Sequence, residues 1–205
     1  MKAPLIAIAR HRLTVDGDGV TTLVAFHGCP LRCRYCLNSQ CWEPEDLWRW
    51  ITPEELVEEL MKDHLYFLAT GGGVCFGGGE PLLYSDFIVQ FCQLCPKEWH
   101  VYLESSLNVP TERLDAVIPY VHYYYIDVKD TNPDIYHRYT GGSPTLLMHN
   151  LQFLADRHIQ ERVVVRLPLI KDYNNDGDRQ CSRHQLEVIG YSRFDLFDYV
   201  LPAAQ

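Results

Sequence analysis

Three cysteines lie close together in the chain, at Cys29, Cys33 and Cys36, directly after the apolar segment 22–27. Spacings of four and three residues allow one loop to bring three thiolates to a single metal centre. Iron–sulfur cubes take up to four cysteine ligands, so three ligands leave one iron with an open coordination position. An open position separates a reactive metal site from a structural one. The triplet therefore predicts an iron–sulfur site that can bind a further ligand.

A closed metal site is the alternative interpretation of the same segment. Cys41 follows five residues after Cys36 and could serve as the fourth ligand of a zinc or iron–sulfur centre. The chain would then be a non-catalytic module that binds a partner. Cys92 and Cys95 fall among apolar residues of an expected helix, and free cysteine packs as a small hydrophobe, so we interpret both as core residues.

Further polar residues follow other predicted strands. Glu80 comes after three glycines at 77–79, and glycine allows a backbone to approach a ligand closely. Asp127 and Lys129 end another apolar segment, and alternation along a strand sends both side chains to the same face. A tight turn and a solvated ion pair are the ordinary interpretations of these two features when each is taken alone.

The elements that must position these residues alternate between strands and helices. We expect a hairpin of 5–15 with 21–26 around the turn 16–19, because Asp-Gly pairs favour tight turns. Thr52, Pro53 and Glu55 predict a helix that begins with a capping box. Further strands are expected at 73–76, 99–103, 122–128, 162–167 and 198–201, and helices at 86–95, 111–118, 144–157 and 182–191.

Alternation of this kind indicates an α/β fold with a parallel sheet. Six strand–helix units predict a partial (β/α)6 TIM-like barrel rather than a closed one of eight. In such sheets the ligand site lies at the carboxyl ends of the strands, which is where the cysteines, Glu80 and Lys129 occur. With 205 residues, we expect a single domain over residues 1–205.

Composition excludes several classes of protein. The net charge is −9, from 18 basic and 27 acidic residues, which argues against a broad nucleic-acid surface. No apolar run approaches the roughly 20 residues that span a bilayer, so we expect no membrane segment. The apolar stretch 5–9 is too short for a secretory signal, and we expect a cytoplasmic protein. In a reducing compartment, clustered cysteines favour metal binding over disulfides.

The pattern C-x3-C-x2-C, with the aromatic Tyr35 before its last cysteine, resembles the signature of the radical S-adenosylmethionine (SAM) superfamily. The resemblance implies a radical SAM core with a [4Fe–4S] cluster on Cys29, Cys33 and Cys36. It also implies that the open iron binds SAM, which is cleaved to methionine and a 5′-deoxyadenosyl radical. No residue is expected to act as a general base.

Within this resemblance the other strand ends receive roles in SAM binding. The turn Gly78-Gly79-Glu80 is similar to the element that receives the methionine amino group. Lys129 is expected at the SAM carboxylate or ribose, and Arg166 in the same cavity. The resemblance also implies a monovalent cation beside SAM, held at positions that correspond to Glu104, Ser105 and Asp127.

The segments 126–129, 139–143, 166–170 and 174–176 occur in the order typical of activating enzymes of glycyl radical enzymes, such as pyruvate formate-lyase activating enzyme. This resemblance covers about residues 20–202. It implies hydrogen abstraction from a glycine of a partner glycyl radical enzyme, with a flavodoxin or ferredoxin-type reductant. The chain lacks the ferredoxin-like insert of many activating enzymes between Cys36 and Thr52. A radical SAM enzyme of the 7-carboxy-7-deazaguanine synthase size class, acting on a small molecule or another peptide, remains the alternative.

Overall fold

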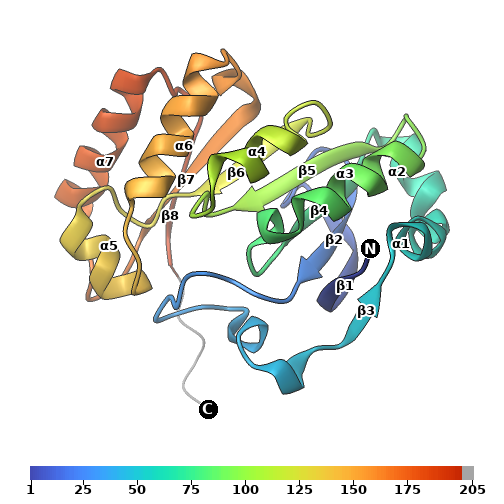
Figure 1. Cartoon of the computed structure of the whole chain (residues 1–205). Coiled ribbons are helices and arrows are strands. Elements are labelled where there is room, and N and C mark those ends of the chain that lie inside the picture. The colour runs from blue at the N-terminus through green and yellow to red at the C-terminus, as the bar shows by residue number, and fades with distance from the viewer. Residues whose placement is uncertain (200–205) are drawn as a thin grey trace. The chain divides into compact units, whose positions relative to one another are not determined.

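The structure, a computed structural model, describes residues 1–199 (Figure 1). The chain divides into two compact units, and each is described by itself. The first contains residues 1–29, 38–105 and 109–125, and the second contains residues 30–37, 106–108 and those from 126 onward. The single domain expected over residues 1–205 stays a prediction. No helix among residues 1–199 is long and apolar enough to cross a membrane.

The first unit is built on a mixed sheet in the order β3-β1-β2-β4-β5. Strands β1 and β2 form the predicted antiparallel hairpin, with Ile8 opposite Val24, and β3 also runs antiparallel to β1. Strand β4 is parallel to both β2 and β5. The strands are β1 (Ala3–Leu13), β2 (Val20–Phe26), β3 (Arg49–Ile51), β4 (Gly73–Gly78) and β5 (His100–Ser105).

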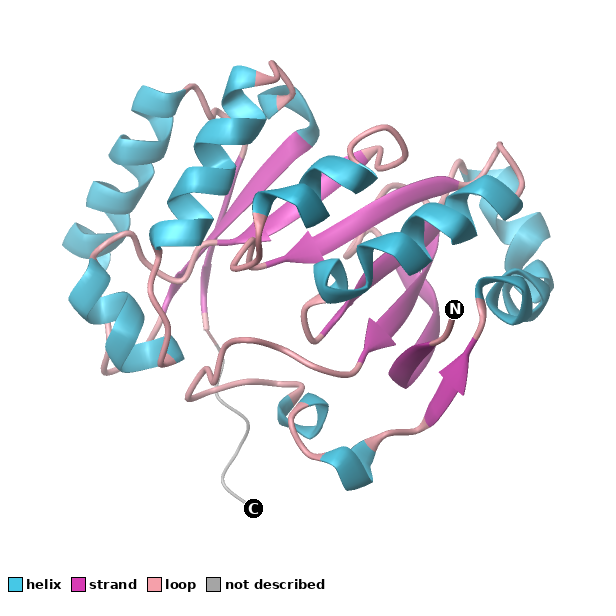
Figure 2. Cartoon of the chain, in the orientation of Figure 1, coloured by secondary structure: helices cyan, strands magenta, loops and turns pink. Residues whose placement is uncertain are grey.

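Helices of the first unit cover this sheet (Figure 2). Helix α1 begins as predicted, because the Thr52 side chain accepts the Glu55 N–H while the Glu55 carboxylate accepts the Thr52 N–H. The rings of Phe26, Phe76 and Phe87 pack between the sheet and α3. The helices are α1 (Pro53–Leu60), α2 (His64–Thr70), α3 (Ser85–Leu94) and α4 (Thr111–Val117), with short 3-10 helices η1 (Ser39–Cys41), η2 (Pro44–Asp46), η3 (Met61–Asp63) and η4 (Pro81–Tyr84).

The second unit repeats the strand–helix alternation. Strand β7 lies between the end of β6 and β8, and β7 and β8 are parallel. Helix α7 packs on β7, and the buried hydroxyl of Tyr191 donates to the carbonyl of Leu151 at 2.7 Å. The elements are β6 (Tyr123–Asp127), α5 (Pro133–Thr140), α6 (Thr145–Asp156), η5 (Gln160–Arg162), β7 (Val163–Leu169), α7 (Asp176–Ile189) and β8 (Phe194–Asp198).

The predicted α/β fold with parallel strands is confirmed, while several boundaries differ. Helix α7 begins at Asp176, not at residue 182, because Asn175 caps it by accepting the N–H groups of Gly177 and Asp178. Helices α2 and α5 were not predicted. The last strand, expected at 198–201, ends at Asp198, and residues 200 and 201 lie outside the described part of the chain.

Candidate functional site

The glycine run after β4 is required by its packing against the end of β2. A Cβ atom on Gly79 would lie 2.2 Å from the carbonyl oxygen of Gly28, and one on Gly78, which has φ +89°, would lie 2.7 Å from Ala25. The close approach allows two backbone hydrogen bonds, from Gly79 N–H to the Phe26 carbonyl at 2.9 Å and from Glu80 N–H to the Gly28 carbonyl at 2.8 Å. The run therefore fixes Glu80 to the segment that leads into Cys29.

Glu80 is held as a buried carboxylate in the first unit. The residue is 1% exposed, and its Oε1 accepts hydrogen bonds from the Ser105 hydroxyl at 2.8 Å and from the Leu82 N–H at 3.2 Å. A buried charge is expensive unless it is hydrogen-bonded, so a carboxylate kept here is suited to meet a cationic group. Glu104 precedes Ser105 in the chain, and a Cβ atom on Gly77 would lie 2.9 Å from the Glu104 Oε2. The structure therefore brings Glu80 and Ser105 together, and Glu104 next to the glycine run.

The three cysteines of the triplet share an environment that differs from the others. Cys29, Cys33 and Cys36 are partly exposed, whereas Cys41 and Cys75 are buried. Cys29 belongs to the first unit, and Cys33 and Cys36 belong to the second. Among residues 1–199, no three His, Cys, Asp or Glu side chains are gathered into a group that could hold a metal ion. Three partly exposed thiols on a single loop are a donor set that fits an iron–sulfur cluster.

Within the second unit, the loop that carries Cys33 and Cys36 is attached to the end of α5. The N–H groups of Arg32 and Arg34 donate to the carbonyls of Thr140 and Tyr139 at 2.8 and 3.0 Å. The buried side chain of Leu31 packs over Gly142, where an added Cβ atom would lie 2.7 Å from the Leu31 Cδ2. The carboxyl-terminal carbonyls of a helix need partners, and here they orient a proposed ligand loop.

Tyr35, which lies in this loop between Cys33 and Cys36, forms a cluster with three other tyrosine rings. Tyr35 contacts Tyr139, Tyr173 and Tyr199, with ring centroids 6.0, 5.6 and 6.5 Å apart. The Tyr199 hydroxyl also donates a hydrogen bond to the backbone carbonyl of Tyr35. Burial and the Asp172 carboxylate raise the pKa of Tyr35 above its ordinary value. The cluster restrains the backbone between Cys33 and Cys36.

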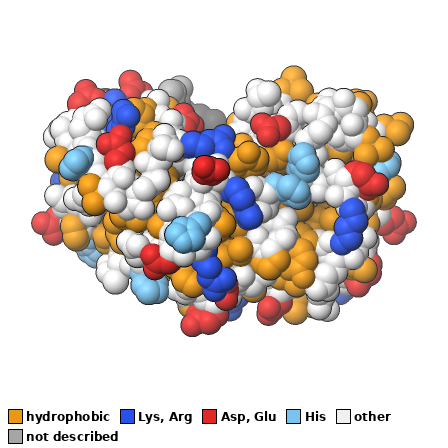
Figure 3. Space-filling model, turned by 90° about the horizontal axis from the view of Figure 1, so that it is seen from above, with side chains coloured by type: hydrophobic (Ala, Val, Ile, Leu, Met, Phe, Trp, Pro, Cys, Tyr) orange, Lys and Arg blue, Asp and Glu red, His pale blue; other side chains and the backbone are white. Residues whose placement is uncertain are grey.

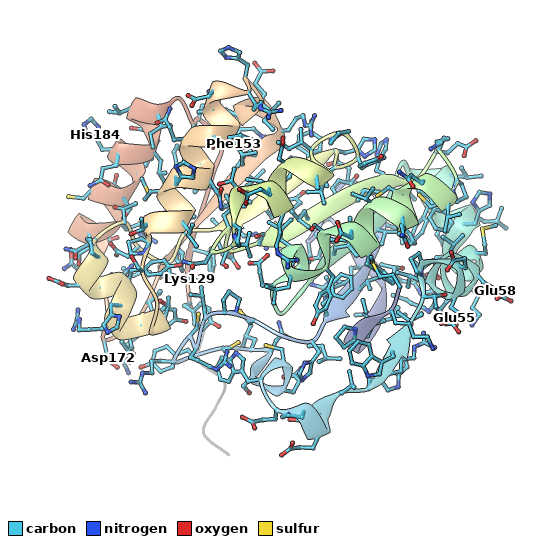
Figure 4. All side chains as sticks on the ribbon, viewed as in Figure 1. Glu55, Glu58, Lys129, Phe153, Asp172 and His184 are labelled. Carbon is cyan, nitrogen blue, oxygen red and sulfur yellow. The ribbon has the colours of Figure 1, made fainter. Side chains whose placement is uncertain are left out.

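Asp127 and Lys129 lie at the end of β6 and form an ion pair, which is the ordinary interpretation given for these two residues in the sequence. The Lys129 Nζ and the Asp127 Oδ2 are 3.2 Å apart, and only 14% of the lysine side chain is exposed. Lys129 is labelled in Figure 4. Burial lowers the pKa of Lys129, but the Asp127 carboxylate and the Cys33 thiol outweigh this effect, so the pKa lies above its ordinary value. Lys129 is therefore a fixed cation near the cysteine loop.

Arg166 lies on β7, where its backbone carbonyl accepts the Val128 N–H at 3.0 Å. Its guanidinium is largely buried, and the Nε lies 3.8 Å from the Asp195 carboxylate on β8. Asn174 connects the end of β7 to the segment after β6, because its side-chain amide donates to Asp130 and to the Pro168 carbonyl, both at 3.2 Å. Asn174 therefore has a structural role, because it links the ends of two neighbouring strands.

The glycine run, Glu80 and the Asp127–Lys129 pair have the packing described above, and their roles in ligand binding stay predictions. The sequence missed the attachment of the cysteine loop to α5 and the contacts of Tyr173 and Tyr199. An Asn-Pro pair at 132–133, followed by Gly141, is the signal that could have found α5. The predicted cation ligands Glu104 and Ser105 belong to the first unit and Asp127 to the second, and that site stays a prediction.

Comparison with known proteins assigns the family. Residues 23–179 match the Radical SAM superfamily. The (2S)-3-sulfopropanediol dehydratase activating enzyme of Klebsiella oxytoca is 36% identical over 149 residues, an alignment that covers 70% of this chain and 46% of that protein. The chain thus spans about half the length of this relative.

A second relative is covered more fully. The pyruvate formate-lyase-activating enzyme of Staphylococcus aureus (strain USA300) is 31% identical over 172 residues, covering 80% of this chain and 68% of that protein. The fold is also similar to a radical SAM methyltransferase from Sphaerobacter thermophilus, with a TM-score of 0.58 and 16% identity over 96% of this chain and 77% of that one. The chain belongs to the radical SAM superfamily, in the group of glycyl radical enzyme activating enzymes.

Proposed function

We propose that this protein is an activase that generates a glycyl radical on a partner enzyme. When bound, a [4Fe–4S] cluster and SAM supply reductive cleavage of SAM to methionine and a 5′-deoxyadenosyl radical, which takes a hydrogen atom from a glycine Cα. Family membership supports this proposal. The observation that carries it is the presence of three partly exposed thiols on one loop, restrained by backbone hydrogen bonds and a tyrosine cluster.

Each site residue has a role that suits its chemistry. Cys29, Cys33 and Cys36 would hold the cluster. Glu80 is a buried carboxylate that would accept a hydrogen bond from the methionine amino group. The hydrogen bond from the Ser105 hydroxyl fixes the orientation of this carboxylate. The positive charge of the Lys129 ammonium suits the SAM carboxylate. A lysine is already protonated at neutral pH, so it can bind the carboxylate without any proton transfer.

The remaining groups would shape the cavity. Gly78 and Gly79 bring backbone close to the ligand, while Arg166 would line the same cavity and Tyr35 would border it. Glu104, Ser105 and Asp127 would bind a monovalent cation. We further propose a flavodoxin or ferredoxin-type reductant and a cytoplasmic setting.

Two other functions lead to different results in simple tests. A small-molecule or peptide substrate would use the same cluster and the same SAM cleavage, but no glycine would lose hydrogen. A closed metal module would require Cys41 as a ligand, and Cys41 is 1% exposed in η1, where its carbonyl accepts the Gly28 N–H at 2.8 Å. This buried position favours a packing role for Cys41.

Isotope transfer tests the proposal. The reconstituted, reduced protein is mixed with SAM and a glycyl radical enzyme that carries glycine deuterated at Cα, under anaerobic conditions. We expect a glycyl radical signal by electron paramagnetic resonance, and deuterium in the released 5′-deoxyadenosine by mass spectrometry. A reaction that releases unlabelled 5′-deoxyadenosine and forms no protein radical, with several glycyl radical enzymes in turn, would contradict the activase function. It would favour a different substrate.

A further inference from the structure

The edge strand β3 presents an unused hydrogen-bonding position in the first unit. β3 ends the strand order of the described chain, with β1 as its neighbour. Trp50 lies opposite Pro4, and the carbonyl of Pro4 accepts the His27 N–H at 2.9 Å, on the β2 side. The N–H and C=O of one residue in a strand point to the same side, so Pro4 and Trp50 form a non-hydrogen-bonded pair. The N–H and C=O of Trp50 therefore point away from β1, toward the free edge.

A groove runs beside this edge, between β3 and α1. It has a volume of about 380 Å³ and is lined by Arg49, Trp50, Ile51, Glu55, Glu58, Glu59 and Lys62. Two large aromatic side chains are exposed here, Trp50 at 55% and Trp48 at 53%. Exposed tryptophans beside a groove are typical of interaction surfaces.

Arg49 provides hydrogen-bond donors to the groove. Its guanidinium lies 4.3 Å from the centroid of the Trp48 ring, which fixes its position. The Nε and Nη2 atoms are buried and have no hydrogen-bond partner among the described residues. Buried donors without an acceptor are costly, and a carbonyl oxygen from a bound segment would satisfy them.

The opposite wall of the groove is acidic, with one carboxylate free. Glu59 is paired with Arg10 and with Lys62, and the Glu55 carboxylate accepts the Thr52 N–H. The exposed Glu58 makes no side-chain hydrogen bond or ion pair within residues 1–199, and Figure 4 shows it with Glu55 on α1. A basic side chain in the groove would therefore meet an available carboxylate.

From these features we infer that β3 and α1 dock an extended segment of a partner protein that carries a lysine or arginine. The segment adds a strand to β3 through the backbone of Trp50, gives a carbonyl to Arg49 and places its basic side chain at Glu58. Addition of a strand to a sheet edge is a recurrent mode of peptide recognition. Self-pairing of two copies is disfavoured, because both would carry the acidic α1 and a net charge of −9.

This docking surface goes beyond the proposed function, since it uses neither the cysteines nor SAM. Peptide binding to the reconstituted protein tests it by fluorescence anisotropy. The probe is a blocked, labelled peptide Thr-Val-Thr-Lys-Thr-Val, compared with the same peptide carrying Glu in place of Lys. We expect the Lys peptide to bind about fivefold more tightly, because one exposed charge pair replaces a repulsion.

Three variants sharpen the test. Glu58→Lys should reverse the preference between the two peptides, whereas Glu54→Lys, on the same helix but outside the groove lining, should preserve it. Trp50→Pro should abolish binding of both peptides without unfolding the protein, since proline is tolerated where the N–H faces solvent on an edge strand. Trp50→Ala keeps the backbone donor and should retain the Lys preference.

Several results would overturn the inference. They are absence of binding, equal binding of the two peptides, an unchanged preference in Glu58→Lys, or full binding by Trp50→Pro. A dimer in sedimentation velocity that Trp50→Pro dissociates would assign the edge to a second copy instead. Release of 5′-deoxyadenosine by the same preparations is measured in parallel, so a failure of docking is distinguished from a failure of the proposed function.

Discussion

Replacing Gly79 by alanine should disrupt the connection between the glycine run and the segment that leads into Cys29. The new Cβ atom would lie 2.2 Å from the Gly28 carbonyl oxygen, and ordinary contact requires about 3.4 Å, so the two segments must separate by roughly 1 Å. The hydrogen bonds from Gly79 and Glu80, now 2.9 and 2.8 Å long, would then exceed the hydrogen-bond range. Loss of two buried backbone bonds costs about 1 to 1.5 kcal/mol each, so we expect about 2 to 3 kcal/mol of destabilisation.

Gly71→Ala is the matched control. Gly71 has φ +67° but an added Cβ atom would meet nothing within 4 Å, so the cost is confined to backbone strain of about 1 kcal/mol. The free energy of unfolding is measured by urea titration, and 5′-deoxyadenosine release is measured after reconstitution. Gly79→Ala should be the less stable variant and should release at least tenfold less product, because Glu80 moves with Gly79. Equal stability of the two variants, or full activity in Gly79→Ala, would refute this explanation of the glycine run.

Three other changes follow from the described contacts. Asn175→Ala removes the cap of α7 and should lower the free energy of unfolding by about 1 kcal/mol in urea titration, whereas the exposed Gln180→Ala should change it little. Tyr199→Phe removes the hydroxyl that holds the Tyr35 carbonyl and should speed iron loss to a chelator, unlike Tyr120→Phe, whose hydroxyl only accepts from Gln93. Burial raises the pKa of Cys92 from 9.0 to about 12, so Cys92 should react with a thiol reagent at pH 8 only on unfolding, while the exposed Cys181 reacts at once. Above pH 9 the unfolded chain loses the Cys92 proton while the folded state still keeps it. The contribution of this thiol to the free energy of unfolding is therefore complete below pH 9 and is lost as the pH rises toward 12.

The parts of the fold with local signals were predicted well. Thr52, Pro53 and Glu55 fixed the start of α1, since a capping box depends only on neighbours in the chain. The alternation of Tyr123, Tyr124 and Tyr125 in β6 likewise follows a local rule, and only Tyr124 is fully buried. The start of α7 was missed although Asn175 and Asp178 carry a cap signal, because the apolar pattern becomes clear only later in the helix.

The candidate site was less predictable where backbone atoms form it. The carbonyls of Tyr139 and Thr140 hold the cysteine loop, and a backbone carbonyl leaves no trace in the choice of side chain. The burial of Glu80 and its bond to Ser105 also join residues 25 positions apart. The spacing of the cysteines, by contrast, is a local property. Basic and acidic side chains are interspersed on the face shown in Figure 3.

The most direct test of the central claim is anaerobic release of 5′-deoxyadenosine from SAM by the reconstituted, reduced protein. The wild type, Cys33→Ser and Cys41→Ser are compared, with iron and sulfide content measured for each. We predict release by the wild type and by Cys41→Ser, and none by Cys33→Ser. Of the two substituted cysteines, Cys33 is a proposed cluster ligand and Cys41 is not. Loss of iron in Cys41→Ser, or no release by a wild-type protein that holds a full cluster, would contradict the account.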